Sequence, residues 1–253
     1  MKIYAVLLAA GTGSRTGLSI PKQLIKINKK EIILRSLEIF LKSKINFEAV
    51  IIATPPPSVF QFNWNDFFEK NLGNDEIEKL RIITGGETRQ QSVDNSIKYL
   101  ESIISPDESE NTVVFIHDSA RPFVTDKELH LLLDKTACHG AAFLCSEVTE
   151  TIKEIKISNP AGFKTLERDN LIAAKTPQVF KFKAIKKALE KAEGDNFIST
   201  DDVSLVENLG LTAASIISTD MNIKITSALD IEIAELFLNK FARINYDKEQ
   251  AAN

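Results

Sequence analysis

The stretch LLAAGTGSRTGLSIPKQ, residues 7–23, decides the fold and the site that we expect for this chain. It begins at the end of an apolar run, residues 3–8, whose lack of alternation predicts a buried parallel strand. The small residues that follow allow a ligand to approach the backbone, whose N–H groups can point at phosphate oxygens. An arginine then offers a planar fork of donors, and a lysine offers a mobile positive charge. The candidate residues of this polyphosphate loop are Ala9, Ala10, Gly11, Gly13, Arg15 and Lys22.

Two common phosphate loops do not fit this stretch. The dinucleotide pattern GxGxxG requires a glycine where Thr16 stands, and the Walker pattern requires Gly-Lys where Thr16 and Gly17 stand. A tight turn with two solvated cations is the alternative interpretation of the glycine spacing. Pro21 weakens that alternative, because it blocks a helix at Ile20 and stiffens the approach to Lys22.

Composition limits the class of protein. The 253 residues allow one large α/β domain or two small ones, and a formal charge of −4 argues against a general nucleic-acid or anionic-membrane partner. No apolar run reaches the roughly 18 to 20 residues that cross a bilayer. The early strand leaves no room for a signal peptide, so we expect a cytoplasmic protein. Cys138 and Cys145 lack the spacing of a metal or redox motif and are expected to be reduced thiols.

Apolar strands alternate with amphipathic helices along most of the chain. We expect strands at residues 3–8, 47–53, 80–83, 112–116 and 212–217. We expect helices at residues 31–41, around 64–68, and at 91–104, 183–192, 203–209 and 227–241. This alternation predicts an α/β fold with a doubly wound, mostly parallel sheet, which binds ligands at the carboxyl ends of its strands. Gly11, Gly86 and Asp118 all follow such strand ends.

A β-arm at about residues 147–170 interrupts this pattern. Residues 148–157 are expected to be a strand, 158–162 a turn, and 163–168 a returning strand. A two-stranded ribbon is marginal alone in water, so its apolar residues need a cover, either their own domain or a second subunit. We expect a single domain over residues 1–244 that includes the arm, and a disordered polar tail at 245–253.

Two further motifs follow strands. In GGETRQQSV, residues 85–93, Thr88 alone would be explained as a helix N-cap, but Arg89 and Ser92 share a helix face and would point at one ligand. In HDSARPF, residues 117–123, Asp118 is either a turn carboxylate paired with Arg121 or a group that binds ribose hydroxyls or waters on Mg²⁺. We expect His117 to be a packed residue rather than a catalyst.

These motifs resemble the 2-C-methyl-D-erythritol 4-phosphate cytidylyltransferase family. The similarity rests on Ala-Ala-Gly-x-Gly-x-Arg, Pro-Lys-Gln, Gly-Gly-x-x-Arg-x-x-Ser, a His-Asp-x-Ala-Arg-Pro block in which Ser119 replaces an alanine, and Asn-x-Lys-x-Thr around Lys224. It runs from about residue 3 to residue 238 with every block in order. Ribitol 5-phosphate cytidylyltransferases share most of these blocks, but the sequences around Ala9, Arg168 and Thr200 favour the first family.

The resemblance implies a Rossmann-like nucleotidyltransferase fold, a Mg²⁺-dependent reaction of CTP with a sugar-alcohol phosphate, and a homodimer formed through the arm. It implies catalytic roles for Arg15, Lys22 and Lys224. It places the nucleotide at Ala9, Ala10, Gly11, Gly13, Gly86, Ser92, Asp118 and Ser119. It places the acceptor at Arg121, Thr151, Arg168, Thr176, Thr200 and Lys224, and leaves open which subunit's site Arg168 serves.

The chemistry of such a reaction fits the residues present. A phosphate monoester is already largely an anion at neutral pH, so its attack requires neither a general base nor a covalent nucleophile. Positioning and charge stabilisation then carry the catalysis. Either Ser199 or Thr200 is expected to cap the helix that follows it, which is compatible with phosphate binding at Thr200. A non-catalytic nucleotide-binding module is the other alternative, and the failed GxGxxG argues against a nicotinamide-linked oxidoreductase.

Overall fold

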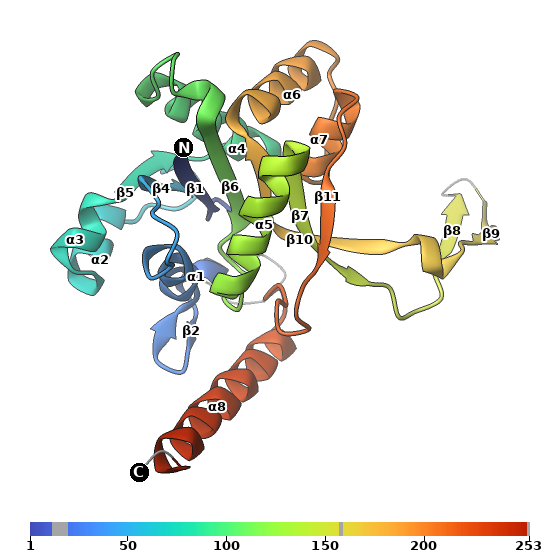
Figure 1. Ribbon diagram of the computed structural model, residues 1–253. Coiled ribbons are helices and arrows are strands. Elements are labelled where there is room, and N and C mark those ends of the chain that lie inside the picture. Colours follow the sequence, from blue (N-terminus) through green and yellow to red (C-terminus); the bar gives the residue numbers. More distant parts are fainter. Residues whose placement is uncertain (12–19, 157–158, 252–253) are drawn as a thin grey trace.

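A seven-stranded sheet forms the centre of the computed structural model, which describes residues 1–11, 20–156 and 159–251 (Figure 1). Its strands lie in the order β11-β7-β10-β6-β1-β4-β5. Their bounds are β1 Lys2–Leu8, β4 Ala49–Thr54, β5 Leu80–Thr84, β6 Thr112–Asp118, β7 Ala141–Glu147, β10 Ile172–Lys181 and β11 Ala214–Ile217. The helices that flank them make an α/β fold.

Most neighbouring strands run parallel, as the apolar runs predicted. β1 pairs in parallel with β4 on one side and with β6 on the other, so that Leu8 lies opposite both Ala53 and Asp118. Within the described sheet, β10 is the strand that runs against its neighbours β6 and β7. The expectation of a doubly wound, mostly parallel sheet is confirmed, and the carboxyl ends of β1 and β6 meet at one edge.

Alternate residues of β1 bury their side chains in two separate apolar layers. Ala5 and Leu7 face helices α1 (Ile32–Leu41), α2 (Trp64–Asn71) and α5 (Asp126–His139). Tyr4 and Val6 face helices α4 (Arg89–Ile103), α6 (Phe182–Gly194) and α7 (Asp202–Asn208). Burying each large apolar side chain contributes about 1.5 to 3 kcal/mol to the free energy of unfolding. This packing fixes the positions of the strand ends, which carry the polar residues.

Several elements differ from the sequence prediction. Strands β7 and β10 and helices α3 (Asn74–Glu78) and α5 were not predicted. Helix α8, expected to end at residue 241, spans Ala228–Ala251, and the disordered tail at residues 245–253 stays a prediction. No glycine or proline interrupts residues 242–251, which removes the usual signals that end a helix.

The arm projects from the sheet as a separate two-stranded ribbon (Figure 1). Strand β8 (Lys153–Lys156) pairs antiparallel with β9 (Asn159–Thr165), and the outer ends of β7 and β10 pair at its base. β9 begins within the predicted turn, of which residue 158 lies outside the described residues. Ile155 and Phe163 face each other across the ribbon with 60% and 64% of their surfaces exposed.

A second small sheet lies near helix α8. It consists of β2 (Lys26–Ile27) and β3 (Lys30–Glu31), and its Ile27 packs in an apolar cluster with Phe123, Ile225 and Ala234 of α8. In the part of the chain that the structure describes, no helix is both long and apolar enough to cross a membrane. The location of the protein in the cell stays a prediction.

Candidate functional site

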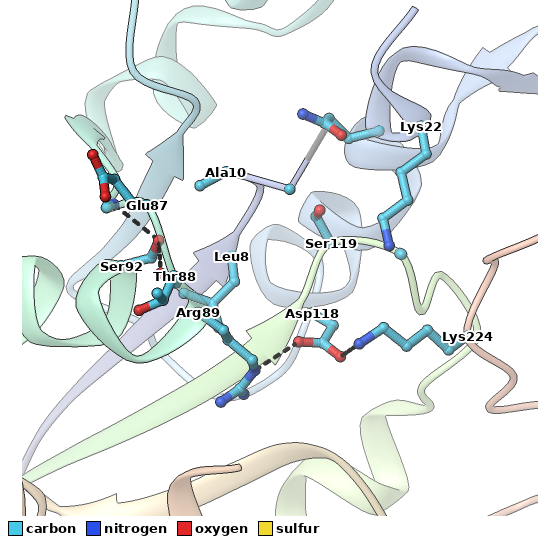
Figure 2. A pocket seen from close by; sticks show the side chains of 14 residues that line it. Leu8, Ala10, Lys22, Glu87, Thr88, Arg89, Ser92, Asp118, Ser119 and Lys224 are labelled. Atoms are coloured by element: carbon cyan, nitrogen blue, oxygen red, sulfur yellow. Dashed lines mark hydrogen bonds and ion pairs between the residues drawn. The ribbon is translucent and has the colours of Figure 1, made fainter. Parts of the chain in front are cut away.

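A cavity of about 170 Å³ opens where β1, β5 and β6 end (Figure 2). Its walls come from four parts of the chain: the loop after β1, the short 3₁₀ helix Lys22–Leu24, the start of α4 and the loop after β6. Lys224 joins them from a fifth segment. The predicted site residues that line the cavity are Ala10, Gly11, Lys22, Gly86, Ser92, Asp118, Ser119 and Lys224.

Gln23 links the loop after β1 to the lysine turn, the short 3₁₀ helix Lys22–Leu24. Ala9 is buried behind the cavity; its backbone N–H donates to the carbonyl of Ala53 and its own carbonyl accepts from Nε2 of Gln23 at 2.7 Å. Because Pro21 stands immediately before the Lys22–Leu24 turn, Lys22 leaves a fixed backbone toward the cavity. Gly13 and Arg15 lie outside the described residues.

The second loop packs closely against the first. A Cβ on Gly85 would lie 2.6 Å from Cβ of Ala10, and a Cβ on Gly86 would lie 2.3 Å from Cβ of Gln91, so neither glycine tolerates a side chain. Thr88 caps helix α4 by accepting the N–H of Gln91 at 3.1 Å, as predicted.

Ser92 holds this second loop in place. Its hydroxyl accepts the N–H of Gly86 at 3.0 Å and donates to the carbonyl of Thr88 at 2.9 Å. Only 2% of its surface is exposed. Ser92 therefore shapes the cavity wall through the backbone of Gly86.

Asp118 is the charged centre of the cavity. Figure 2 shows it between Lys224, whose Nζ lies 2.7 Å from Oδ2, and Arg89, whose Nε lies 3.4 Å from Oδ1. Arg121 approaches Oδ2 at 3.7 Å. Burial would raise the pKa of Asp118, but the three cations hold it well below its usual range. The carboxylate is therefore ionised and compensated before any ligand binds.

The backbone around Asp118 fixes Ser119 and Lys224. The N–H of Ser119 donates to the carbonyl of Leu8 at 3.0 Å, which joins the ends of β1 and β6. The N–H of Ile225 donates to the carbonyl of Ala120 at 2.9 Å, and the Ile225 side chain is fully buried. Lys224 therefore projects to the opposite side, as its flanking isoleucines predicted.

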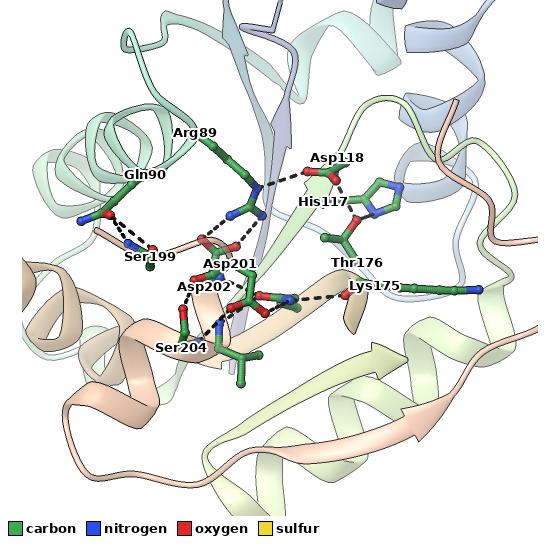
Figure 3. A network of polar contacts seen from close by, with 12 residues as sticks. Arg89, Gln90, His117, Asp118, Lys175, Thr176, Ser199, Asp201, Asp202 and Ser204 are labelled. Carbon is green, nitrogen blue, oxygen red and sulfur yellow. Dashed lines mark hydrogen bonds and ion pairs between the residues drawn. The ribbon is translucent and has the colours of Figure 1, made fainter. Parts of the chain in front are cut away.

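Arg89 also pairs with a residue that the sequence did not single out for the site. Its Nη1 and Nη2 donate to the two carboxylate oxygens of Asp202 at 2.8 and 2.7 Å, and the Asp202 side chain is completely buried (Figure 3). Burial lowers the pKa of Arg89, but Asp202 and then Asp118 outweigh it and raise the pKa above its usual value. The two partners are 113 positions apart, so no local pattern revealed them.

The cap of helix α7 differs from the prediction. Neither Ser199 nor Thr200 caps it; Asp201 does, by accepting the N–H of Ser204 at 3.1 Å. The next residue, Asp202, begins the helix, and its N–H and that of Val203 donate to Oε1 of Gln178. Thr200 is exposed in the segment before the cap.

His117 is a packed residue, as expected. Its ring is completely buried, with Nε2 2.9 Å from the carbonyl of Arg121 and Nδ1 3.0 Å from Oγ1 of Thr176. The same hydroxyl oxygen accepts the N–H of Asp118 at 3.1 Å. Burial lowers the pKa of His117 to about 4, so the ring is neutral at physiological pH. Thr176 therefore lies directly behind Asp118.

Of the six predicted acceptor residues, Lys224 lines the cavity and the other five do not. Thr151 and Arg168 are exposed at the base of the arm, where Nη1 of Arg168 lies 3.4 Å from the carbonyl of Thr149, and Thr200 is exposed before α7. Arg121 is mostly buried beside Asp118, and its Nη1 donates to the carbonyl of Asn222 at 3.1 Å. Within one chain, the acceptor residues are therefore divided between the cavity, the buried surroundings of Asp118 (Arg121 and Thr176), the segment before α7 and the arm.

The described residues form no protein cage for a metal ion. No group of three or more His, Cys, Asp or Glu side chains within them is placed to hold one. Asp118 and Glu87 are the carboxylates that line the cavity among the described residues, and Asp118 is already paired with cations. Mg²⁺ keeps several waters and binds through one or two carboxylates and substrate phosphates. The residues present therefore fit a hydrated ion carried on a triphosphate.

The mostly parallel sheet, the small residues after its first strand and the cationic cavity at its carboxyl edge fit a nucleotidyltransferase. A model of the 2-C-methyl-D-erythritol 4-phosphate cytidylyltransferase family matches residues 3–240, and the chain belongs to this family.

Individual relatives agree with the family match. The 2-C-methyl-D-erythritol 4-phosphate cytidylyltransferase of Clostridioides difficile is 35% identical over 239 residues, which cover 94% of each chain. That of Halalkalibacterium halodurans is 36% identical over 241 residues, 94% of this chain and 97% of the relative. The crystal structure of the Francisella tularensis enzyme superimposes with a TM-score of 0.75 at 29% identity, over 93% of this chain and 99% of that one.

Proposed function

We propose that this protein joins CTP to 2-C-methyl-D-erythritol 4-phosphate, giving the CDP-alcohol and pyrophosphate, a step of isoprenoid precursor synthesis. The observation that carries the proposal is the convergence of Lys22, Lys224 and the Gly85–Gly86 loop on one cavity beside Asp118. Family membership supplies the choice of CTP and of the acceptor. The geometry supports a site for an anionic, polyphosphate ligand.

In the proposed reaction, an oxygen of the acceptor phosphate attacks the α-phosphorus of CTP. The bond from that phosphorus to the bridging α–β oxygen breaks, and the leaving pyrophosphate takes the electron pair. Lys22 lies on the wall formed by the lysine turn, where its charge would stabilise the triphosphate. We propose the same role for Arg15, which follows the first loop in the sequence.

Lys224 is proposed to bridge the two substrates. An ammonium group has three donors, and the contact with Asp118 at 2.7 Å uses one of them. The remaining donors would hold the acceptor phosphate close to the α-phosphate without a change in the charge of Lys224. Asp118 would fix the direction of these donors, and Arg121 would add a second cation beside them.

Mg²⁺ is proposed to enter with CTP. When bound, it would neutralise charge on the triphosphate oxygens, and Asp118 would contact one of its waters. The residues of this chain would otherwise act by holding charge and position.

The arm is proposed to complete the acceptor site across a homodimer. Thr151 and Arg168 are exposed at the base of the arm and do not line their own chain's cavity. Exposed apolar side chains on the same arm, Ile155 and Phe163, offer a surface for a second subunit. We propose that Arg168 serves the acceptor phosphate in the partner's site.

Pyrophosphate release with CTP and Mg²⁺ tests the proposed activity, with methylerythritol 4-phosphate and ribitol 5-phosphate in separate reactions. We expect release with the first acceptor. Release with ribitol 5-phosphate alone would contradict the proposed choice of acceptor. No release with either acceptor would contradict the proposed cytidylyltransferase activity.

Lys22→Ala is expected to lower kcat by about 10²- to 10³-fold, as for the loss of one charge-stabilising donor. Lys26→Ala is the matched control, because Lys26 is an exposed lysine four residues later that pairs with Glu31 outside the cavity. Turnover of the Lys22 variant within a few-fold of the wild type would contradict the role of Lys22.

A further inference from the structure

The segment formed by residues 197–202 contains Thr200 and is held by side chains of neighbouring elements. Gln90, in the first turn of α4, accepts the N–H of Ser199 at 2.9 Å and donates to the carbonyl of Phe197 at 3.1 Å. Gln178 of β10 accepts the N–H of Asp202 at 2.8 Å. The path of this segment therefore depends on α4, which lines the nucleotide cavity, and on β10, whose Thr176 lies behind Asp118.

The strongest tie is the ion pair between Arg89 and Asp202 at the end of this segment. Two parallel hydrogen bonds of 2.8 and 2.7 Å join the guanidinium to a carboxylate that has no exposed surface (Figure 3). Such a bidentate pair fixes both distance and orientation, and a lysine cannot reproduce it. Breaking a buried pair by removing one partner leaves the other charge uncompensated.

Arg89 extends the same tie to the cavity. Its Nε lies 3.4 Å from Oδ1 of Asp118, and Lys224 contacts the other oxygen of that carboxylate at 2.7 Å. Asp202, Arg89, Asp118 and Lys224 therefore form a row of alternating charges from the start of α7 to the cavity (Figures 2 and 3). A change at Asp202 alters the charge that balances Arg89 and, through it, the position of Asp118.

We propose that Arg89 and Asp202 are positioning residues that align the 197–202 segment, and with it Thr200, on the nucleotide cavity. This inference rests on the proposed function, because the inference assigns the 197–202 segment to the side of the site where the acceptor would bind. Arg89 lines the nucleotide cavity, but both terminal nitrogens of Arg89 are bonded to Asp202. The charge of Arg89 therefore holds the 197–202 segment in place. In-line transfer is sensitive to such alignment, since a displacement of about 1 Å can cost 10²-fold in rate.

Asp202→Asn tests the pair with little change in volume. We expect kcat/KM for the acceptor to fall about 10- to 100-fold, with the Kd for CTP within about threefold of the wild type. Arg89→Lys is expected to behave in the same way, because it keeps the charge and loses the fork. Asp195→Asn is the matched control: it removes the same charge just before the segment, where Asp195 is exposed and pairs with Lys191 rather than with Arg89.

Hydrogen exchange gives a readout that does not depend on turnover. In Asp202→Asn, the amides of residues 197–201 should exchange at least tenfold faster, while those in the middle of α4 keep their wild-type rates. Exchange of the segment amides at the wild-type rate in Asp202→Asn would overturn the inference. Parallel losses in CTP affinity, acceptor kinetics and melting temperature would also overturn it, because they would indicate a purely structural pair. A wild-type protein without turnover would contradict the proposed function instead, and the exchange experiment would still decide the inference.

Discussion

His117 and Thr176 show how one neutral side chain can fix a charged one. The carbonyl of Arg121 can only accept, so His117 donates to it from Nε2; Nδ1 of the neutral ring then accepts the hydroxyl hydrogen of Thr176, whose oxygen accepts the N–H of Asp118. This arrangement suits the neutral ring with its proton on Nε2. A second ring proton, on Nδ1, would require the Thr176 hydroxyl to turn its hydrogen away and to accept from the ring as well as from Asp118.

This arrangement predicts an acid-sensitive fold. The pKa of His117 is about 4 in the folded state against its usual value of 6.5, so the unfolded chain binds more protons between these values. The contribution of the neutral ring to the free energy of unfolding is complete above pH 6.5 and is lost as the pH falls toward 4. Each unit of pH in this window lowers the free energy of unfolding by up to about 1.4 kcal/mol.

Urea unfolding at pH 7, 6 and 5 measures this effect. We expect His117→Gln to lose stability with falling pH less steeply than the wild type. His139→Gln, at the exposed C-terminal end of α5, is the control and should follow the wild type. If the free energy of unfolding fell equally steeply with pH in the His117 variant and in the wild type, the buried ring would not be the cause of the loss of stability in acid.

At the scale of elements, the limits of sequence reasoning are clearest in β10. Continuous apolar runs revealed β1, β4, β5 and β6, and Thr88 was recognised as a cap candidate because it stands between a glycine turn and a helix. β10 contains Lys175, Pro177 and Gln178, which do not look like a central strand. It is accommodated because the register shifts between Ala174 and Gln178, and proline is tolerated at such irregularities.

The site was only partly predictable for the same reason. Residues that follow a strand within one motif, such as Gly86 and Asp118, could be placed at the cavity from their position alone. Asp202 could not, because its role is set by Arg89 on another helix. Ser199 and Thr200 were good cap candidates by type, but Asp201 is nearer to the first turn of α7.

The arm leads to a prediction about assembly. Ile155 and Phe163 are paired across the ribbon and remain exposed, so a second subunit would bury both. We expect the wild type to sediment with the mass of two chains and Ile155→Asp/Phe163→Asp to sediment as one chain with much lower activity. Lys164→Gln alters the neighbouring cross-strand pair with Glu154 and is the control. A fully active wild-type monomer would exclude the proposed interface.

At the scale of the whole molecule, the cavity depends on distant parts of the chain. Lys22, Gly86, Asp118 and Lys224 meet only in the folded protein. A ligand that contacts all of them therefore binds the folded state and not the unfolded chain. By mass action, a ligand at about 100 times its Kd adds about 2.7 kcal/mol to the free energy of unfolding.

Thermal unfolding with CTP and Mg²⁺ measures this coupling. For a chain of this size we expect the melting temperature to rise by roughly 5 to 10 °C at saturating CTP. Cytidine at the same concentration lacks the phosphates and should give a much smaller shift. Equal shifts with both compounds would mean that the cationic wall around Lys22 and Lys224 does not bind the triphosphate.

The strand order also has a consequence for biosynthesis on the ribosome. β1, β4, β5 and β6 are neighbours in the sheet and leave the ribosome first, so the nucleotide side of the cavity can begin to assemble early. β7 follows them, but its partners in the described sheet, β10 and β11, both come later in the chain. Between the synthesis of Asp118 and that of Lys181, at about 5 to 20 residues per second, one edge of β6 stays unpaired for roughly 3 to 13 s. During that interval the nascent chain carries one open edge on β6 and the unpaired strand β7, and such edges are prone to pair with another chain.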